Sequence, residues 1–301
     1  MLNKATVFRF NTQASKVISK DVLKAKLKER PARECKQTEE IVFGWASFTS
    51  DPEDVLLDVG SASHMRLEIS ERKIPAKALK RELNKRVKQA EAKEGKRLKR
   101  DQKDEIIAQI KMEFLPKTIP TESIVTASID WTESLLIVDE SAKKAETLTT
   151  LLRGGLGSLP IARIGAEEDS HVVFSQMITE DLAIEQIEMG DTATLENMTS
   201  KEKVSISNGD LHCDEVKAHI SSEMVPRKVR LHFGDDCSAQ VSDDLLFSGI
   251  KISAAAKERQ GYDDIEDEVS KIQADLFIWQ SAVVQMLSFL NPGLKISPAR
   301  P

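Results

Sequence analysis

A strongly basic stretch, residues 72–117, constrains the fold of this chain more than any other feature of its sequence. It holds sixteen Lys or Arg residues and seven Asp or Glu residues, a net charge of +9, whereas the whole 301-residue chain carries −6. The remaining 255 residues therefore carry −15. Such a separation is typical of a polyanion-binding element on an acidic body, because clustered charges create a local field that the net charge hides.

The stretch is also patterned as helix. Pro75 suits a first helical turn, since proline needs no N–H donor there. One narrow apolar stripe follows at spacings of three and four, formed by Ala78, Leu79, Leu83, Val87 and Ala90. Gly95 interrupts the pattern, Asp101 is expected to cap a second helix, and Pro116 is expected to end it. The apolar face of the second helix consists of Ile106, Ile107, Ile110 and Phe114. We predict two helices, or one long broken helix, that project from the fold.

Basic residues of this stretch fall beside the apolar stripe, where they can contact phosphates. The residues that we expect to do so are Lys77, Arg81, Lys85, Lys88, Lys96, Arg97, Lys99 and Arg100. The alternative is a solvated helix with charge pairs four residues apart, such as Glu82 with Arg86. The charge pattern alone leaves both interpretations open.

Composition predicts a soluble globular protein, with 40% hydrophobic and 31% charged residues. No apolar run reaches the roughly 18 to 20 residues that span a bilayer, and the N-terminus does not resemble a secretory signal. The three cysteines lie outside any C-x-x-C motif, which fits a reducing compartment. We therefore expect a cytoplasmic protein.

The expected fold class is α+β, with mixed sheets. Strands are predicted at 5–10, 55–59, 65–69, 124–131 and 134–139, and helices at 19–30 and 141–153. Residues 1–74 and 121–165 are expected to form a central α+β domain, from which the basic helical arm, 75–120, projects. Residues 166–301 are expected to form a C-terminal α+β domain that ends in a long helix at 266–290.

The C-terminal part has a less regular pattern. Strands are predicted at 172–174, 193–196, 204–207, 228–233 and 245–252. Helices are predicted at 181–189 and at 210–220, and Asp210 is expected to cap the second of these.

Catalytic and metal-binding motifs are not evident in the sequence. His212, Cys213, His232 and Cys237 are the candidate soft ligands, but their spacing fits a zinc site poorly. The glycine cluster 154–157 lacks the lysine of a phosphate-binding loop and follows a predicted helix, so it is expected to end that helix. We expect no enzyme activity, no cofactor and no metal. A DNA-processing enzyme that uses Asp139, or Asp235 with Asp236, stays open as an alternative.

Three parts of the chain together resemble one known family. These are the basic arm with the FLPK segment at 114–117, the block IDWTESLLIVDESAKKAETLTTLLRGGLGSLPI at 129–161, and ADLFIWQSAVVQML at 274–287. Their order and spacing resemble the bacterial recombination-associated protein RdgC family, and the likeness runs over most of the chain. The first seventy residues match only weakly.

The resemblance implies a protein without catalytic activity that binds double-stranded DNA without sequence preference. It implies a horseshoe-shaped monomer that closes into a ring-shaped homodimer around DNA, sits on the nucleoid and limits access of the RecA recombinase. It also implies a dimer contact at the end of the arm, where Phe114, Leu115 and Ile119 stand; the family often has an aromatic residue where this chain has Ile119.

One departure from the family concerns the C-terminal half. Basic residues precede the family's counterpart of Asp210, whereas this chain has Ser207, Asn208 and Gly209 there. This departure weakens the expectation of DNA contacts from the C-terminal half. A different class of function also remains open, a protein-interaction module whose basic arm docks on an acidic partner.

Overall fold

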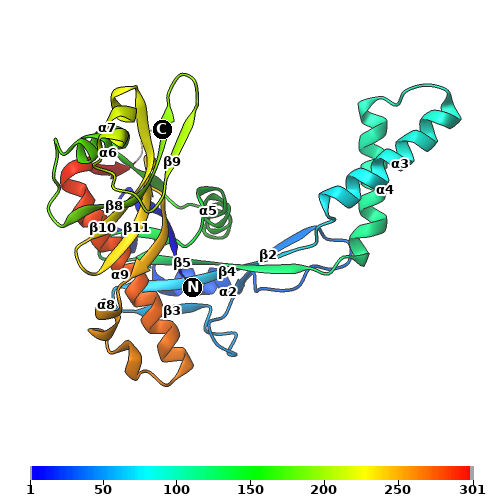
Figure 1. The fold of residues 1–301 in the computed structure, drawn as a ribbon. Coiled ribbons are helices and arrows are strands. Elements are labelled where there is room, and N and C mark those ends of the chain that lie inside the picture. Colours follow the sequence, from blue (N-terminus) through cyan, green and yellow to red (C-terminus); the bar gives the residue numbers. More distant parts are fainter. Residues whose placement is uncertain (1, 299–301) are drawn as a thin grey trace. The chain divides into compact units, whose positions relative to one another are not determined.

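The computed structural model describes residues 2–298 of the chain (Figure 1). The helices are α1 (Ala14–Val17), α2 (Lys20–Lys28), α3 (Ala76–Glu94), α4 (Arg100–Phe114), α5 (Ala142–Leu156), α6 (Ser170–Thr179), α7 (Asp214–Ser221), α8 (Ala254–Glu258) and α9 (Glu268–Leu294), with short 3₁₀ segments η1 (Leu115–Lys117) and η2 (Tyr262–Asp264). The strands are β1 (Lys4–Phe10), β2 (Ile41–Ala46), β3 (Leu56–Val59), β4 (Ala62–Glu71), β5 (Thr121–Asp130), β6 (Leu135–Val138), β7 (Ile161–Ala166), β8 (Ile187–Asn197), β9 (Lys203–Ile206), β10 (Met224–Phe233), β11 (Cys237–Ser242), β12 (Phe247–Ile252) and β13 (Ile296–Pro298).

The chain divides into two compact units. The large unit consists of Met1–Lys28, Ser47–Arg66 and Val125–Pro301, and the small unit of Glu29–Ala46 and Leu67–Ile124. Strands β4 and β5 contribute residues to both units, because one unit boundary falls inside each of these strands. The three domains predicted from sequence have other boundaries than these two units, and that division stays a prediction.

A long antiparallel sheet organises the large unit, which confirms the α+β class. Its strand order from β4 is β4-β5-β6-β1-β12-β11-β10-β8-β9. Strand β1 is central to it: it pairs antiparallel with β6, β7 and β12. The sheet is antiparallel where mixed sheets were expected, since hairpins such as β3–β4, β5–β6 and β10–β11 join neighbouring strands.

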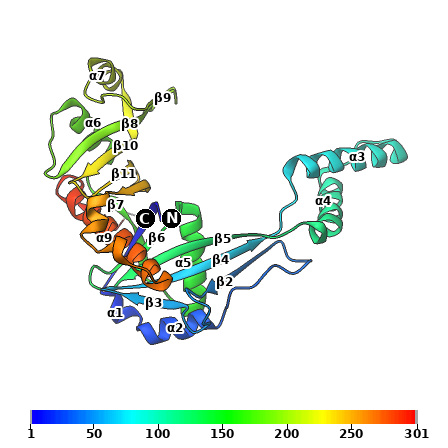
Figure 2. The ribbon, with the colours of Figure 1, turned by 60° about the horizontal axis from the view of Figure 1, so that its bottom comes forward.

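The core of the large unit lies between one face of this sheet and helices α6, α7 and α9. Trp279, Val283, Met286 and Leu290 of α9 are fully or almost fully buried, as is Phe174 of α6. The indole N–H of Trp279 donates to the carbonyl of Lys4 at 3.0 Å, which ties α9 to β1. Figure 2 shows α9 running along the sheet toward β7. Within residues 2–298, no helix has both the length and the hydrophobicity required to cross a bilayer.

Most predicted elements of the N-terminal half are confirmed, but two elements of the C-terminal half were predicted wrongly. Residues 172–174 were expected to form a strand and lie in helix α6, and residues 181–189 were expected to form a helix and instead lead into β8. Short apolar runs such as Val172-Val173-Phe174 suit both kinds of element, and tertiary packing decides between them. Helix α7 begins at Asp214, so the cap expected at Asp210 was also wrong; its carboxylate accepts the N–H of His212 at 2.9 Å instead.

Candidate nucleic-acid interface

Helices α3 and α4 of the small unit are joined by a tight, basic turn. Gly95 has a left-handed backbone (φ 66°) and donates its N–H to the carbonyl of Glu91 at 2.9 Å. The Glu91 carboxylate also accepts the N–H of Leu98 at 3.0 Å, and the Leu98 side chain is buried. The turn is therefore held from inside, and four exposed basic side chains surround it: Lys96, Arg97, Lys99 and Arg100.

The start of α4 differs from the prediction that Asp101 caps it. Lys99 is the N-cap residue, and its N–H donates to the side-chain oxygen of Gln102 at 3.0 Å. The helix begins at Arg100, so Asp101 already lies inside its first turn and is exposed. An acidic residue there still stabilises the helix, because the N-terminal end of the helix dipole is positive.

An ion pair and a set of apolar side chains join α3 to α4. Arg86 donates to Glu82 on its own helix at 3.0 Å and to Glu113 on α4 at 2.6 Å. This contact holds the pKa of the Glu113 carboxyl below its usual value and raises the pKa of Arg86. Ile110 of α4 is 1% exposed. Arg86 thus serves the helical hairpin itself, as the charge-pair interpretation of Glu82 and Arg86 predicts.

The outward face of α3 carries basic residues that no ion pair occupies within the described chain. Lys77, Arg81, Lys85 and Lys88 are all exposed. At about 100° per residue they fall within an arc of about 80°, and they extend over about 16 Å of helix. The half-buried residues of α3, which include Leu83 and Val87, lie on the other side of the helix. We name these four bases the α3 basic face.

The outward face of α4 carries the opposite charge. Asp104 and Glu105 follow Asp101 at spacings of three and four, and all three are exposed, so they share one side of the helix. The helical hairpin is therefore basic on α3 and at its turn, and acidic on α4. The seven acids of the arm were counted in the sequence but not assigned to a face, although the same helical spacing places these three on one side of α4.

Arg72 fastens the two ends of the segment that contains both helices. Its guanidinium donates to the carbonyl of Cys35, at 3.2 and 3.3 Å, and to the carbonyl of Thr118. Lys111 on α4 pairs with Glu40 at 2.7 Å. These contacts use two more of the sixteen basic residues of the stretch.

An apolar surface lies where α4 ends. Ile119 is 87% exposed and Met112 is 74% exposed, the two largest exposures among the large hydrophobic side chains of the described chain. A groove of about 400 Å³ runs beside Met112 and is lined by Gln37, Thr38, Glu40, Ala108, Lys111, Met112, Leu115 and Pro116. Of the other two predicted contact residues, Leu115 is 6% exposed and Phe114 is half-buried, with the Lys117 ammonium 5.1 Å from its ring centre.

The acidic candidates for catalysis hold the fold together. Asp139 accepts the N–H groups of Asn3 and Lys4 at 3.1 and 2.8 Å, and so fixes the start of β1 rather than a helix. Asp236 forms an ion pair with Arg259. Across residues 2–298, no group of three or more His, Cys, Asp or Glu side chains is placed to hold a metal ion.

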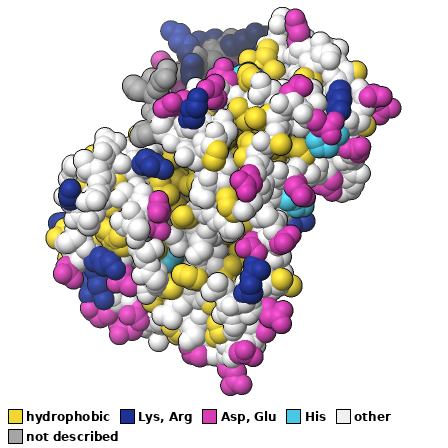
Figure 3. All heavy atoms as spheres, turned by 90° about the vertical axis from the view of Figure 1, so that its left-hand side faces the viewer, with side chains coloured by type: hydrophobic (Ala, Val, Ile, Leu, Met, Phe, Trp, Pro, Cys, Tyr) yellow, Lys and Arg dark blue, Asp and Glu magenta, His cyan; other side chains and the backbone are white. Residues whose placement is uncertain are grey.

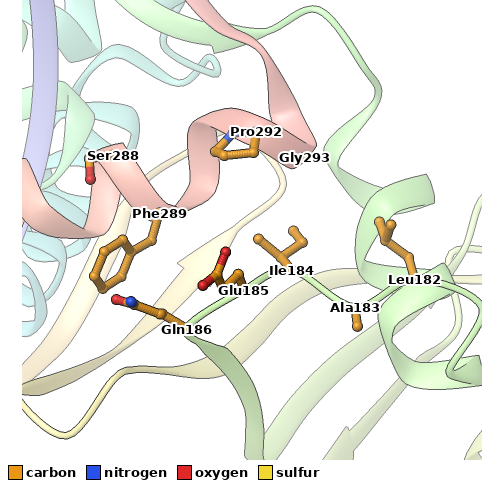
Figure 4. Close-up of a pocket in the computed structure, with 9 residues that line it drawn as sticks. All are labelled: Leu182, Ala183, Ile184, Glu185, Gln186, Ser288, Phe289, Pro292 and Gly293. Atoms are coloured by element: carbon orange, nitrogen blue, oxygen red, sulfur yellow. The ribbon is translucent and has the colours of Figure 1, made fainter.

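One hollow of the large unit has little charge in its lining. This hollow, shown in Figure 4 and about 360 Å³ in volume, lies between the segment before β8 and the end of α9. Glu185 is the charged residue among its nine lining residues, and Phe289 and Ile184 supply apolar surface. Figure 3 shows acidic and basic side chains interspersed over one face of the molecule, with hydrophobic side chains between them.

Comparison with known proteins adds the family. A family model described as "Putative exonuclease, RdgC" matches residues 1–296. Proteins named recombination-associated protein RdgC are similar over nearly their whole length: the one from Psychromonas ingrahamii is 28% identical, covering 93% of both chains, and the one from Shewanella piezotolerans is 27% identical, covering 96% of both. The one from Pseudoalteromonas atlantica is 27% identical and covers 89% of both chains.

Proposed function

Because this chain belongs to the RdgC family, we propose that it binds double-stranded DNA without sequence preference and takes part in recombination as a nucleoid-associated protein. The observation that carries this proposal is the α3 basic face. Its four bases are exposed, share one side of a helix and lack acidic partners within the described chain. Lys and Arg side chains on a regular helix neutralise backbone phosphates, which every DNA sequence presents alike.

The acidic face of α4 determines which side of the helical hairpin faces DNA in the proposed contact. Duplex DNA repels the face with Asp101, Asp104 and Glu105, and attracts the α3 basic face and the turn. Lys96, Arg97, Lys99 and Arg100 at the turn extend the phosphate contacts. The rest of the chain carries a net charge of −15, so the arm is the main basic segment of the sequence.

The second part of the proposal is a ring-shaped homodimer that encircles DNA and thereby limits access of RecA. The apolar surface around Ile119 and Met112 supports it, because such exposed side chains are stabilised by burial against a partner. The groove beside Met112 can accept an aliphatic side chain from a second copy. In a symmetric dimer Ile119 of each copy can enter the groove of the other.

Binding of a random-sequence duplex across a salt series tests the proposed DNA contact. We expect the quadruple variant K77Q/R81Q/K85Q/K88Q to lose affinity and to reduce the slope of log affinity against log salt by about 3 to 4, at about 0.9 per phosphate contact. The matched control is D101N/D104N/E105N on α4, which should not weaken binding. Equal slopes for wild type and the quadruple variant would refute the role of the α3 basic face.

Two alternative functions can be tested with the same protein and the same duplex DNA. If the arm docks on an acidic protein partner instead, the variant K99E/R100E would leave duplex affinity unchanged. The family description includes the word exonuclease, so end-labelled duplex should be incubated with the protein and magnesium. We propose that binding alone is the function, and release of nucleotides that scales with protein concentration would contradict this.

A further inference from the structure

The antiparallel register of β10, β11 and β12 places a second group of basic residues on one face of the large unit. Val229, Leu231 and Phe233 of β10 point into the core. Lys228, Arg230 and His232 alternate with them, so they lie on the opposite face. Ser242, Gln240 and Ser238 of β11 stand directly opposite these three, and Lys251 of β12 stands opposite Ser238. Lys228, Arg230 and Lys251 therefore share one sheet face, which we name the sheet basic face.

Gly190 makes room for Arg230 to lie across this face, and the backbone of Gly249 accepts a hydrogen bond from it. A Cβ atom on Gly190 of β8 would lie 2.3 Å from Cγ of Arg230, which is too close for any side chain other than hydrogen. Gly249 of β12 stands at the other end, where its carbonyl accepts Nη1 of Arg230 at 2.9 Å. Ser238 Oγ lies 3.5 Å from the same nitrogen. Since both contacts use Nη1, the donors of Nε and Nη2 stay available for a ligand within the described structure.

These cations lack an acidic partner within residues 2–298. Two carboxylates nearby are used elsewhere: Glu196 pairs with Lys203 at 3.2 Å, and Asp243 pairs with Arg227. Glu188 of β8 stands opposite His232 and forms no ion pair with the three bases in the described structure. Burial and the nearby Arg230 together lower the pKa of Lys228. Two like charges lie two residues apart on one strand, about 6.6 Å, without an anion between them. The arrangement is electrostatically unfavourable until an anion is bound.

Small hydroxyl and amide side chains surround the three bases. Ser248 of β12, which pairs with Gln240, has a buried Oγ that has no hydrogen-bond partner in the described structure. A polar, solvated face is common in antiparallel sheets. A face that is only solvated, however, does not need a glycine at position 190 to accommodate the stem of Arg230. It also does not need three basic side chains that lack acidic partners. An extended anion such as a phosphate backbone would accept hydrogen bonds from these groups.

We propose that the sheet basic face is a second contact surface for the phosphate backbone of duplex DNA. This inference rests on the proposed function, because it assigns additional contacts to the same ligand. It places DNA contact in the C-terminal half on β10 and β12, away from Ser207–Gly209, where basic residues are lacking. Lys228, Arg230 and Lys251 act on phosphates, and Gly190 and Gly249 position Arg230.

The test is the salt dependence of random-duplex binding by full-length variants. We expect K228Q/R230Q to bind about ten-fold more weakly at low salt, with a salt slope smaller by about 2, since each phosphate contact contributes about 0.9. Lys251 is exposed, and its side chain has no ion pair in the described structure. K251Q should therefore lower the salt slope by about 1 and leave the circular dichroism spectrum unchanged. R163Q is the matched control, because Arg163 of the same unit is paired with Asp244 at 2.6 Å.

A variant that keeps every charge tests the position of Arg230. G190A should weaken binding at least three-fold, because the added methyl group displaces the arginine stem. Wild-type slopes for both K228Q/R230Q and K251Q would overturn the inference while leaving the proposed function intact, provided that the α3 variants still lose affinity. Failure of the wild-type protein to bind duplex at any salt concentration would overturn the proposed function, and this inference with it.

Discussion

The guanidinium of Arg86 on α3 donates a 2.6 Å hydrogen bond to the carboxylate of Glu113 on α4. Arg86 also pairs with Glu82 on its own helix, so this basic residue holds the helical hairpin together. Lys77, Arg81, Lys85 and Lys88 lie on the same helix as Arg86 but on its outer side. Helix α3 thus carries the ion pairs of Arg86 on one side and the proposed DNA-binding residues on the other.

Removing Arg86 is expected to loosen the helical hairpin without changing the α3 basic face. In R86Q, Glu82 and Glu113 lose their shared cation, so amide hydrogens of α4 should exchange faster with solvent than in the wild type. K80Q is the matched control, because Lys80 is exposed and has no ion pair in the described structure. Equal exchange rates in R86Q and K80Q would contradict the bridging role.

The same bridge predicts a pH dependence. Arg86 lowers the pKa of Glu113 below its usual value of 4.5. The carboxylate of Glu113 therefore binds a proton more weakly in the folded chain than in the unfolded chain. The stabilisation is therefore present above about pH 4.5 and is lost as the pH falls through the lowered pKa. The protection factors of α4 amides, which correct for the intrinsic exchange rate at each pH, should fall over that range in the wild type and not in E113Q.

Ile119 is expected to hold two copies together. I119E places a charge in a surface that the proposed dimer buries, so it should shift the protein from dimer to monomer in sedimentation velocity. I119F adds apolar area and should strengthen association. The exposed Val172 in the large unit provides a control, V172E, which should leave the dimer unchanged. A wild-type protein that sediments as a monomer at all concentrations would refute the homodimer.

His64 in β4 is expected to make the fold sensitive to acid. It is completely buried, neither ring nitrogen has a partner in the described structure, and burial lowers its pKa from 6.5 to about 4. The unfolded chain therefore takes up a proton at a higher pH than the folded one. Stability should fall as the pH drops from about 6.5 to about 4, by up to about 3 kcal/mol. Urea unfolding at several pH values should show a weaker dependence in H64L than in the exposed-site control H232Q.

A buried hydrogen bond between Gln280 and Asp130 is expected to anchor α9 to β5. Both side chains are less than 5% exposed, and the other carboxylate oxygen of Asp130 accepts the N–H groups of Thr132 and Glu133 at 2.8 Å. Q280L removes one donor from a buried carboxylate and should lower the free energy of unfolding by about 1 to 3 kcal/mol. Adding D130N should recover part of this loss in a double-mutant cycle, whereas Q285L on the same helix should have a smaller effect.

The two helices of the basic arm were predictable from sequence because their determinants are local. Spacings of three and four, a proline at the start and Gly95 at the turn all act within a few residues. The exposed positions of Lys77, Arg81, Lys85 and Lys88 follow from the same spacing. The cap of α4 was not predictable to one residue, since Lys99 is a cap only because Gln102 supplies the hydrogen bond.

The sheet basic face could not be predicted, because it depends on pairing between distant strands. Arg230 is 40 residues from Gly190 in sequence, yet the two lie in contact because β8 and β10 are neighbours. Strand β11 has alternating small and polar residues that give a weak hydrophobic signal, and the sequence analysis missed it. Register is set by the packing of all strands together.

The most direct test of the central claim compares DNA release from linear and closed circular duplexes of the same random sequence over a salt series. The account predicts steep salt dependence, equal affinity for unrelated sequences, and slower release from closed circles than from linear duplexes, because a ring cannot slide off a circle. Absence of duplex binding at low salt would contradict the account and assign the basic arm to a protein partner.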